Sequence, residues 1–132
     1  MHILRDLYGQ VYTTPVVASE YGSDLPSWVR IVEPEDYQKQ QLLELQIDPG
    51  EASAINLAIE LSCDLIVLDD LKARKVSEQL QLNITGTIGL IVKAKQSGLI
   101  ESATVVLDNL QETNFRISKE LIREALTQAG EL

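Results

Sequence analysis

The sequence has little of what many enzymes use, with one cysteine, one histidine and no long apolar run. A single cysteine excludes an internal disulfide framework and a zinc site built from several cysteines. Cys63 stands in an apolar stretch, which favours a small buried side chain over a reactive thiol. The only histidine is His2 at the terminus, so the body of the chain offers no histidine base for nucleophilic catalysis.

Targeting and nucleotide-binding signals are also missing. No apolar segment approaches the length that spans a bilayer, and Asp6 follows the start too soon for a signal peptide. Neither a Walker motif nor a Gly-x-Gly-x-x-Gly run is present. The length of 132 residues and the apolar content of 45% fit one globular domain. We therefore expect a single domain over residues 1–132, in the cytoplasm and without a membrane partner.

The charge is unevenly distributed along the chain, although the formal net charge is −9. Residues 1–71 hold thirteen acids and three bases, residues 72–98 carry a net +4, and residues 99–132 carry a net −3. A basic segment after an acidic cluster suits phosphates held beside a metal site. The same pattern also fits two solvated helix faces. Lys72, Arg74 and Lys75 are therefore candidate phosphate contacts with an ordinary alternative.

Short β-rich segments alternate with segments of helical periodicity. Strands are predicted over residues 11–13, 28–32, 65–68 and 82–85. Helices are predicted over residues 3–8, 15–21, 35–45, 49–62, 70–80, 87–96, 104–112 and 118–128. This alternation predicts an α/β fold with a parallel sheet and right-handed crossovers.

Ligands in such sheets gather beyond the carboxyl ends of the strands. Asp69 and Asp70 come directly after the apolar run Leu65–Leu68, and Thr85 and Thr87 fall at the end of the last predicted strand. Adjacent carboxylates repel each other, so a cation at this position would stabilise the aspartate pair. Mg²⁺ and Mn²⁺ take oxygen ligands of this kind. Helix capping explains one aspartate equally well and the second less well.

Two glutamates have weaker local support. The segment Asp48-Pro49-Gly50-Glu51 has the form of a capping box, in which Glu51 closes the start of a helix. On local sequence alone, capping is favoured over metal binding for Glu51. Glu20 lies in the helix after the first strand and alone reads as an ordinary surface acid.

Four segments together resemble a known family. They are ILRDLYGQVYTTPVVASEY, DPGEASAINLAIE, LIVLDDLKARKVSEQLQL and ITGTIGLIVKAKQSGLI. The pattern DD-x-x-AR followed by TGT-x-G-x-x-x-x-AK-x-x-G is specific in combination. From about Ile3 to its end, the chain resembles the DUF3368 branch of PIN-like proteins, which are related to VapC-type toxin ribonucleases.

The resemblance implies a metal-dependent endoribonuclease of a toxin–antitoxin pair. The implied fold is a three-layer α/β/α arrangement with a parallel sheet of about four strands. The implied Mg²⁺ or Mn²⁺ ligands and catalytic residues are Glu20, Glu51, Asp69 and Asp70, with Thr85 and Thr87 beside them. The implied partners are RNA and an antitoxin protein.

One departure from the family pattern bears on activity. Relatives begin with an apolar strand that ends in an aspartate ligand, whereas Met1 falls inside the helix that follows this strand. The expected domain is thus truncated at its N-terminus, with strand edges open to pairing in a homodimer or larger assembly. A misassigned start codon, a decayed gene and a gap-covering dimer are three open explanations. The alternative function is an inactive PIN-like protein that acts through protein–protein contacts or dimerisation. A phosphoacceptor receiver domain fits poorly, because no acid pair follows an early strand.

Overall fold

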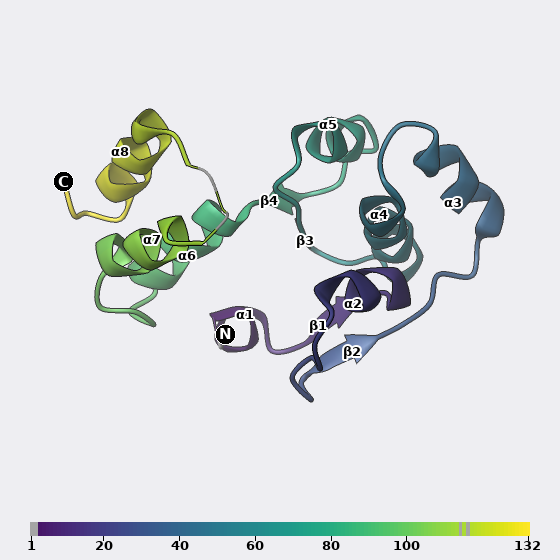
Figure 1. Cartoon of the computed structure of the whole chain (residues 1–132), viewed down its shortest axis with the longest axis horizontal. Helices are drawn as coiled ribbons and strands as arrows, with labels where there is room; N and C mark the ends of the chain where they lie inside the picture. The colour runs from purple at the N-terminus through teal and green to yellow at the C-terminus, as the bar shows by residue number, and fades with distance from the viewer. Residues whose placement is uncertain (1–2, 114, 116) are drawn as a thin grey trace. The chain divides into compact units, whose positions relative to one another are not determined.

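The computed structural model describes residues 3–113, 115 and 117–132 (Figure 1). His2, the terminal histidine discussed above, lies outside the described residues. The chain divides into two compact units. Residues 8–85 form what we term the sheet unit, and residues 1–7 with 86–132 form the helical unit. The single domain over residues 1–132 stays a prediction.

The elements follow the predicted alternation, with bounds that differ by a few residues. The sheet unit contains, in chain order, β1 (Val11–Thr13), α2 (Pro15–Tyr21), β2 (Val29–Ile31), α3 (Tyr37–Glu44), α4 (Pro49–Leu61), β3 (Ile66–Val67), α5 (Leu71–Gln79) and β4 (Ile84–Thr85). The helical unit contains α6 (Thr87–Gln96), α7 (Ala103–Gln111) and α8 (Lys119–Gln128). The first helix, α1 (Ile3–Tyr8), ends at Gly9, whose φ of 76° suits a left-handed C-cap.

Local sequence explains where most helices begin. A side-chain oxygen at the N-cap accepts a hydrogen bond from an N–H in the first turn, which satisfies a donor that the helix leaves unpaired. The capping residues are Thr14 for α2, Asp36 for α3, Asp48 for α4, Asp70 for α5, Ser102 for α7 and Ser118 for α8. Two of these helices also begin with a proline, which lacks the unneeded N–H.

The four strands are parallel, as predicted, but they do not form one sheet within the described part of the chain. β1 pairs with β2, with Val11 opposite Val29, and β3 pairs with β4, with Ile66 opposite Ile84. Strands of two or three residues make few ladder hydrogen bonds. The two pairs are connected instead through α4, which packs against α2, α3, α5 and β3 (Figure 1). The α/β class is confirmed, and the continuous four-stranded sheet is corrected to two pairs.

The core of the sheet unit forms around α4. Ala52 and Ile55 of this helix are fully buried, and they cluster with Leu43, Ile66 and other apolar side chains of neighbouring elements. Cys63 is half-buried against this cluster, and burial followed by the nearby Asp64 charge raises the pKa of its thiol. A raised thiol pKa lowers nucleophilicity, in line with the structural role predicted for this cysteine.

A polar clamp fixes the start of α3 against α4. The Glu60 carboxylate accepts hydrogen bonds from the N–H groups of Glu35, at 2.9 and 3.0 Å, and of Asp36, at 2.8 Å. The buried Asn56 donates to the Asp36 carbonyl at 3.0 Å and to the Gln40 side chain at 3.2 Å. These bonds leave the segment little freedom, so α3 is held in place by α4.

The helical unit has its own core, in which Leu107 of α7 and Ala125 of α8 pack against α6. Glu131 closes the amino end of α7: its carboxylate accepts from the N–H groups of Ala103 at 2.6 Å and Thr104 at 3.0 Å. The Lys95 ammonium lies 3.3 Å from the same carboxylate. Among the described residues, no helix has the length and apolar character to cross a membrane.

Glu131→Gln is expected to destabilise the helical unit at neutral pH. Hydrogen bonds from the Thr104 hydroxyl and from the Ala103 and Thr104 N–H groups lower the pKa of Glu131 to about 2. A depressed carboxyl pKa contributes stability above the unfolded value of 4.5, and this stability is lost as the pH falls through about 2.

Thermal unfolding followed by circular dichroism between pH 2 and 7 measures this contribution. The gap in melting temperature between wild type and Glu131→Gln should narrow as the pH drops from 4.5 to 2. Glu124→Gln, which changes an exposed acid on α8, is the matched control. An equal loss in both variants, or a constant gap across the range, would contradict a specific cap.

Candidate active site

Acidic side chains gather where α4 begins. Asp48 caps this helix, and its carboxylate accepts a hydrogen bond from the Glu51 N–H at 2.9 Å. The carboxyl groups of Asp48 and Glu51 are also hydrogen-bonded to each other. The Asp48 half of the predicted capping box is thus present. The contacts of the described residues include no bond from the Asp48 N–H to the Glu51 side chain, whose carboxyl group lies beside that of Asp48.

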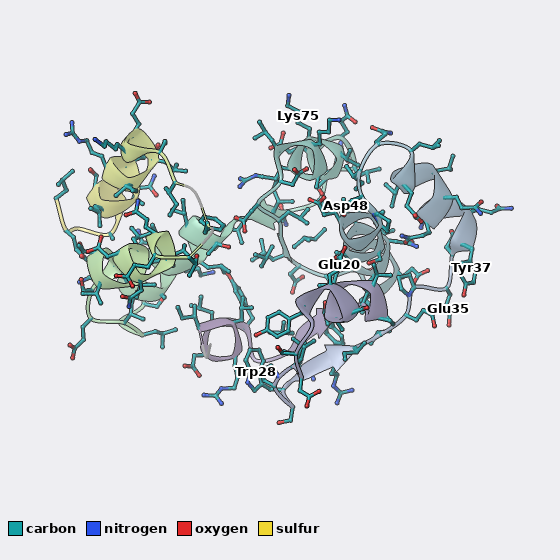
Figure 2. All side chains as sticks on the ribbon, viewed as in Figure 1. Glu20, Trp28, Glu35, Tyr37, Asp48 and Lys75 are labelled. Atoms are coloured by element: carbon teal, nitrogen blue, oxygen red, sulfur yellow. The ribbon has the colours of Figure 1, made fainter. Side chains whose placement is uncertain are left out.

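Glu20 reaches the same place from α2. Its carboxylate packs directly on Gly50, so that a Cβ added at position 50 would contact Glu20 Oε1 and lie 2.9 Å from its Cδ. Gly50 is the second residue of α4 and is buried. Figure 2 labels Glu20 on α2 and Asp48 at the start of α4, on the two helices that pack together. A glycine at position 50 leaves the space that the Glu20 carboxylate occupies.

A buried hydrogen-bond chain fixes the helix that carries Glu20. The Ser53 hydroxyl donates to the Gly50 carbonyl at 2.8 Å. Because this uses the only hydroxyl proton of Ser53, Thr14 is the donor in the 2.6 Å bond between the two hydroxyl oxygens. Thr14 Oγ1 also accepts from the Val17 N–H and caps α2. Thr14 and Ser53 are 0% and 1% exposed, so the start of α2 is tied to the start of α4 without competition from water.

The carboxylates affect one another through space. The pKa of Glu51 is raised from 4.5 to about 7, first by burial, then by the hydrogen bond with Asp48, and then by the charges of Asp48, Asp70 and Glu20. Three acids besides Glu51 therefore act on its carboxyl group. We refer to Glu20, Asp48, Glu51 and Asp70 as the acid cluster.

The two predicted aspartates occupy different environments. Asp70 caps α5, with its Oδ2 accepting from the Ala73 N–H at 3.0 Å, and its charge reaches Glu51. Asp69 is exposed directly before it and is absent from the charges that raise the Glu51 pKa. The structure thus brings Glu20, Glu51 and Asp70 together around α4.

The acid cluster has suitable donor atoms for a divalent cation, but its side chains are not arranged to bind one. Its donors are carboxylate oxygens, which Mg²⁺ and Mn²⁺ prefer, and their repulsion is of the kind a cation relieves. In the described part of the chain, however, no three His, Cys, Asp or Glu side chains converge closely enough to hold a metal ion. The cluster has the right donor types, and its side chains stand apart from a ligating arrangement.

The predicted hydroxyl and basic residues lie on several elements. Thr85 ends β4 half-buried, and its carbonyl accepts from the Leu68 N–H at 2.8 Å. Thr87 begins α6 and belongs to the helical unit. Lys72, Arg74 and Lys75 all lie on α5, which Asp70 caps. The predicted basic residues and the acid cluster thus belong to the same unit.

An open hollow of about 440 Å³ lies beside the acid cluster. Its lining includes Asp48 and Glu51 at the start of α4, together with Asp70 and Lys72 at the start of α5. Three acids of the cluster and one base therefore face an accessible recess.

Sequence reasoning missed Asp48 as a member of the acid cluster and missed the chain from Thr14 to Ser53. The capping box contained a signal for Asp48, because residues three apart at a helix start bring their side chains together. Thr14 before Pro15 signalled a cap. No local signal connected Thr14 to Ser53, which is 39 residues away.

Comparison with known proteins gives one match. The model of the DUF3368 family, described as a PIN domain, matches residues 1–131. No curated protein and no solved structure matches the chain.

Proposed function

Because the chain belongs to the DUF3368 family of PIN domains, which are generally nucleases, we propose that it is an Mg²⁺- or Mn²⁺-dependent endoribonuclease. The proposed ligands and catalytic residues are Glu20, Glu51, Asp69 and Asp70. A bound divalent ion would supply an activated water and stabilise charge on the leaving oxygen.

The observation that carries this proposal is the gathering of Glu20, Asp48 and Asp70 around Glu51 at the start of α4. Burial first, and then these neighbouring acids, raise the pKa of Glu51 to about 7, and like charges this close together are unfavourable for the fold alone. A cation would remove this repulsion, and ligands must be ionised to bind it. The crowding of Glu20, Asp48 and Asp70 around Glu51 is therefore best explained as preparation for a positive ligand.

The chain's own residues would position the acid cluster and bind the phosphate of the substrate. Asp70 links the acid cluster to α5, because its cap fixes the position of its carboxylate relative to that helix. Lys72, two residues later, lines the hollow that the acids face and is placed to hold a phosphate. The tie between Thr14 and Ser53 fixes the start of α2, the helix that carries Glu20.

A finer proposal is that this nuclease is the toxin of a toxin–antitoxin pair in the cytoplasm. Its support is the family resemblance, together with apolar side chains on and directly after α3 that are open to a partner. Tyr37, Leu42 and Leu45 are 69%, 64% and 81% exposed, while only Leu43 of that helix is buried. An antitoxin or a second copy of the chain would cover such a surface.

Asp70→Asn is expected to weaken Mn²⁺ binding by at least about tenfold while the fold is kept. Asparagine caps helices as well as aspartate does, so the bond to the Ala73 N–H survives and only the charge is lost. Titration calorimetry with Mn²⁺ measures the effect, and Asp69→Asn tests the neighbouring proposed ligand. Asp24→Asn, an exposed acid in the loop before β2, is the control.

A different result would favour the alternative function. If the wild-type protein binds no Mn²⁺ or Mg²⁺ at millimolar concentration, the chain is an inactive PIN-like protein that acts through protein contacts or dimerisation. The observation in favour of this alternative is that no three acids converge within the described residues. Sedimentation of the metal-free protein would then show a dimer or larger assembly. A monomer would instead indicate that the chain acts by binding a different protein.

A further inference from the structure

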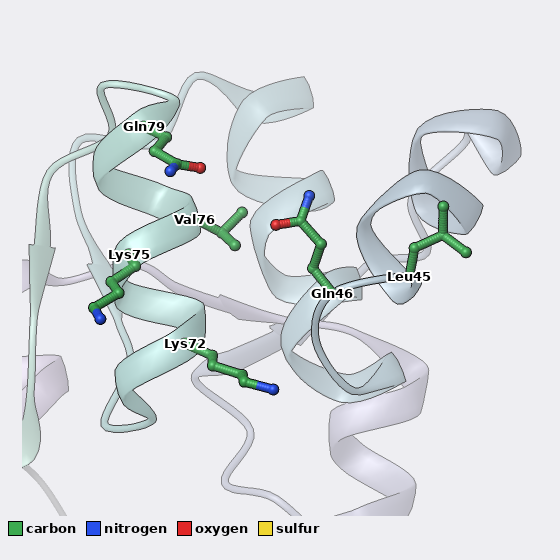
Figure 3. A pocket seen from close by; sticks show the side chains of 6 residues that line it. All are labelled: Leu45, Gln46, Lys72, Lys75, Val76 and Gln79. Carbon is green, nitrogen blue, oxygen red and sulfur yellow. The ribbon is translucent and has the colours of Figure 1, made fainter.

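A second hollow lies along α5, beside the acidic one. It has a volume of about 370 Å³. Its lining consists of Lys72, Lys75, Val76 and Gln79 on α5, and Leu45 and Gln46 on the segment after α3 (Figure 3). Positions 72, 75, 76 and 79 follow the spacing of one helix face. One side of α5 therefore forms a wall of the second hollow.

The two hollows adjoin. Leu45, Gln46 and Lys72 line both of them. Lys72 thus stands between the recess that Asp48, Glu51 and Asp70 face and the hollow along α5. A chain-like ligand with one group at the acids would place its neighbouring group in the second hollow.

The wall opposite α5 is well supported. The N–H groups of Gln46 and Ile47 both donate to the Leu43 carbonyl, at 3.0 and 3.1 Å. Leu43 and Ile47 are buried in the core of the sheet unit, with 8% and 7% exposure. Because buried residues flank Leu45 and Gln46 on both sides, these two side chains project from a fixed turn.

The lining has the chemistry of a nucleotide site. Lys72 and Lys75 line the hollow, and no carboxylate pairs with either of them within the described ranges. Figure 3 shows Lys72 and Gln79 extending from α5 toward the segment of Gln46, whose amide extends back toward α5. Each amide offers donors and an acceptor to a base edge.

We propose that the hollow along α5 holds the nucleotide next to the cleaved phosphodiester of a single-stranded RNA. Lys72 contacts the phosphate between the two hollows. Lys75 also lines the hollow, but its side chain extends away from Gln46 (Figure 3), so it contacts the next phosphate where the RNA leaves the hollow over the outer side of α5. Gln46 and Gln79 contact the base and set which bases are accepted. This inference rests on the proposed nuclease function. It adds to that function the path of the RNA across the protein and the residues that select its bases.

Arg74 has no part in this hollow, although the sequence marked it beside the two lysines. It is half-buried and does not line either recess. It has the same charge, lies on the same helix and differs in the face it occupies. Arg74→Gln is therefore the matched control for Lys72→Gln and Lys75→Gln.

The first test is fluorescence anisotropy with a labelled single-stranded RNA of mixed sequence. EDTA is present, so that the measured RNA binding does not depend on a metal. Lys72→Gln should weaken binding roughly 5- to 10-fold, and the slope of log K against log salt should fall by about 0.7 for each lysine removed. Arg74→Gln should change neither value. Glutamine is a good helix former, so α5 is kept in all three variants.

The second test concerns base preference. The relative affinities for oligomers of A, C, G and U should change in Gln46→Ala or Gln79→Ala, while the salt slope stays constant. A uniform weakening of all four oligomers in both variants would overturn the role of the amides in selectivity.

The outcomes separate this inference from the nuclease proposal. Equal losses of RNA affinity in Lys72→Gln and Arg74→Gln would overturn the proposal that the hollow along α5 binds RNA. This holds even if the wild-type protein binds Mn²⁺ and cleaves RNA. If the protein binds no Mn²⁺ but its RNA binding still depends on the two lysines, the proposed nuclease function is overturned. The RNA-binding role of the hollow along α5 is then supported. Binding of an acidic peptide through Lys72 and Lys75, without any RNA binding, overturns the inference.

Discussion

Glu51→Gln is expected to raise the free energy of unfolding at pH 8 and to lower Mn²⁺-dependent RNA cleavage roughly 100-fold. Both effects come from the removal of one charge. The amide that replaces the Glu51 carboxyl can donate to the Asp48 carboxylate as the protonated carboxyl does, without the repulsion from Asp70 and Glu20. The gain in stability is about 1–2 kcal/mol, after the pKa shift is discounted for solvent screening.

The sign of the pH dependence follows from the raised pKa. Below pH 4.5, Glu51 is protonated in both the folded and the unfolded chain, and above pH 7 it is ionised in both. Between these values the folded chain binds more protons, so the stability of the wild-type protein falls as the pH rises. The advantage of Glu51→Gln should therefore be absent at pH 4.5 and complete above pH 7.

Urea unfolding across this pH range measures the stability effect, and a cleavage assay on labelled RNA measures the other. Glu44→Gln is the control, because Glu44 lines the same hollow and is not among the charges that act on Glu51. A loss of stability in Glu51→Gln at pH 8 would show that Glu51 serves the fold as a cap. Unchanged cleavage would remove it from the site.

Gly50→Ala is expected to lower cleavage roughly 10- to 100-fold while the fold remains as stable as before. The new Cβ would occupy the space of the Glu20 carboxylate, which is the flexible end of an exposed side chain and moves away. Alanine in the first turn of α4 is otherwise favourable, by about 0.5 kcal/mol. The backbone carbonyl that Ser53 bonds is unchanged.

A double-mutant cycle shows whether the effect acts through Glu20. In a Glu20→Ala background the carboxylate is already gone, so the added Gly50→Ala change should have no further effect on cleavage. Thermal melts of all four proteins exclude unfolding as the cause. If Gly50→Ala lowers cleavage equally in both backgrounds, the glycine acts on α4 itself and Glu20 has no role in the site.

The sequence predicted best what neighbouring residues decide. Asp48, and one member of the pair Asp69–Asp70, were recognisable as caps because a helix start needs an acceptor within three residues. The strand before Asp70 was visible as an apolar run. A further strand over residues 82–85 also followed from the alternation of strands and helices, although its pairing with β3 was not predicted.

The assembly of the candidate site depends on contacts that no local pattern contains. From its local sequence Glu20 looked like a surface acid. The family resemblance first assigned it to the site, and the packing of its carboxylate on Gly50 then showed that it lies at the start of α4. The pKa of Glu51 depends on several elements at once, so spacing within the capping box could not reveal it. The division of the strands into two pairs likewise reflects tertiary packing around α4 rather than strand propensity.

The position of α4 has a consequence for how the sheet unit opens. Seven of its residues are buried, and it contacts both the helix after β1 and the strand β3. Because the described residues form two separate strand pairs rather than one continuous sheet, separation of α4 would release α2, α5 and both pairs in a single cooperative step. Glu20, Glu51 and Asp70 would then disperse together. Local fraying that leaves α4 in place would keep the acids in position, so amide protection of α4 should report directly on the integrity of the site.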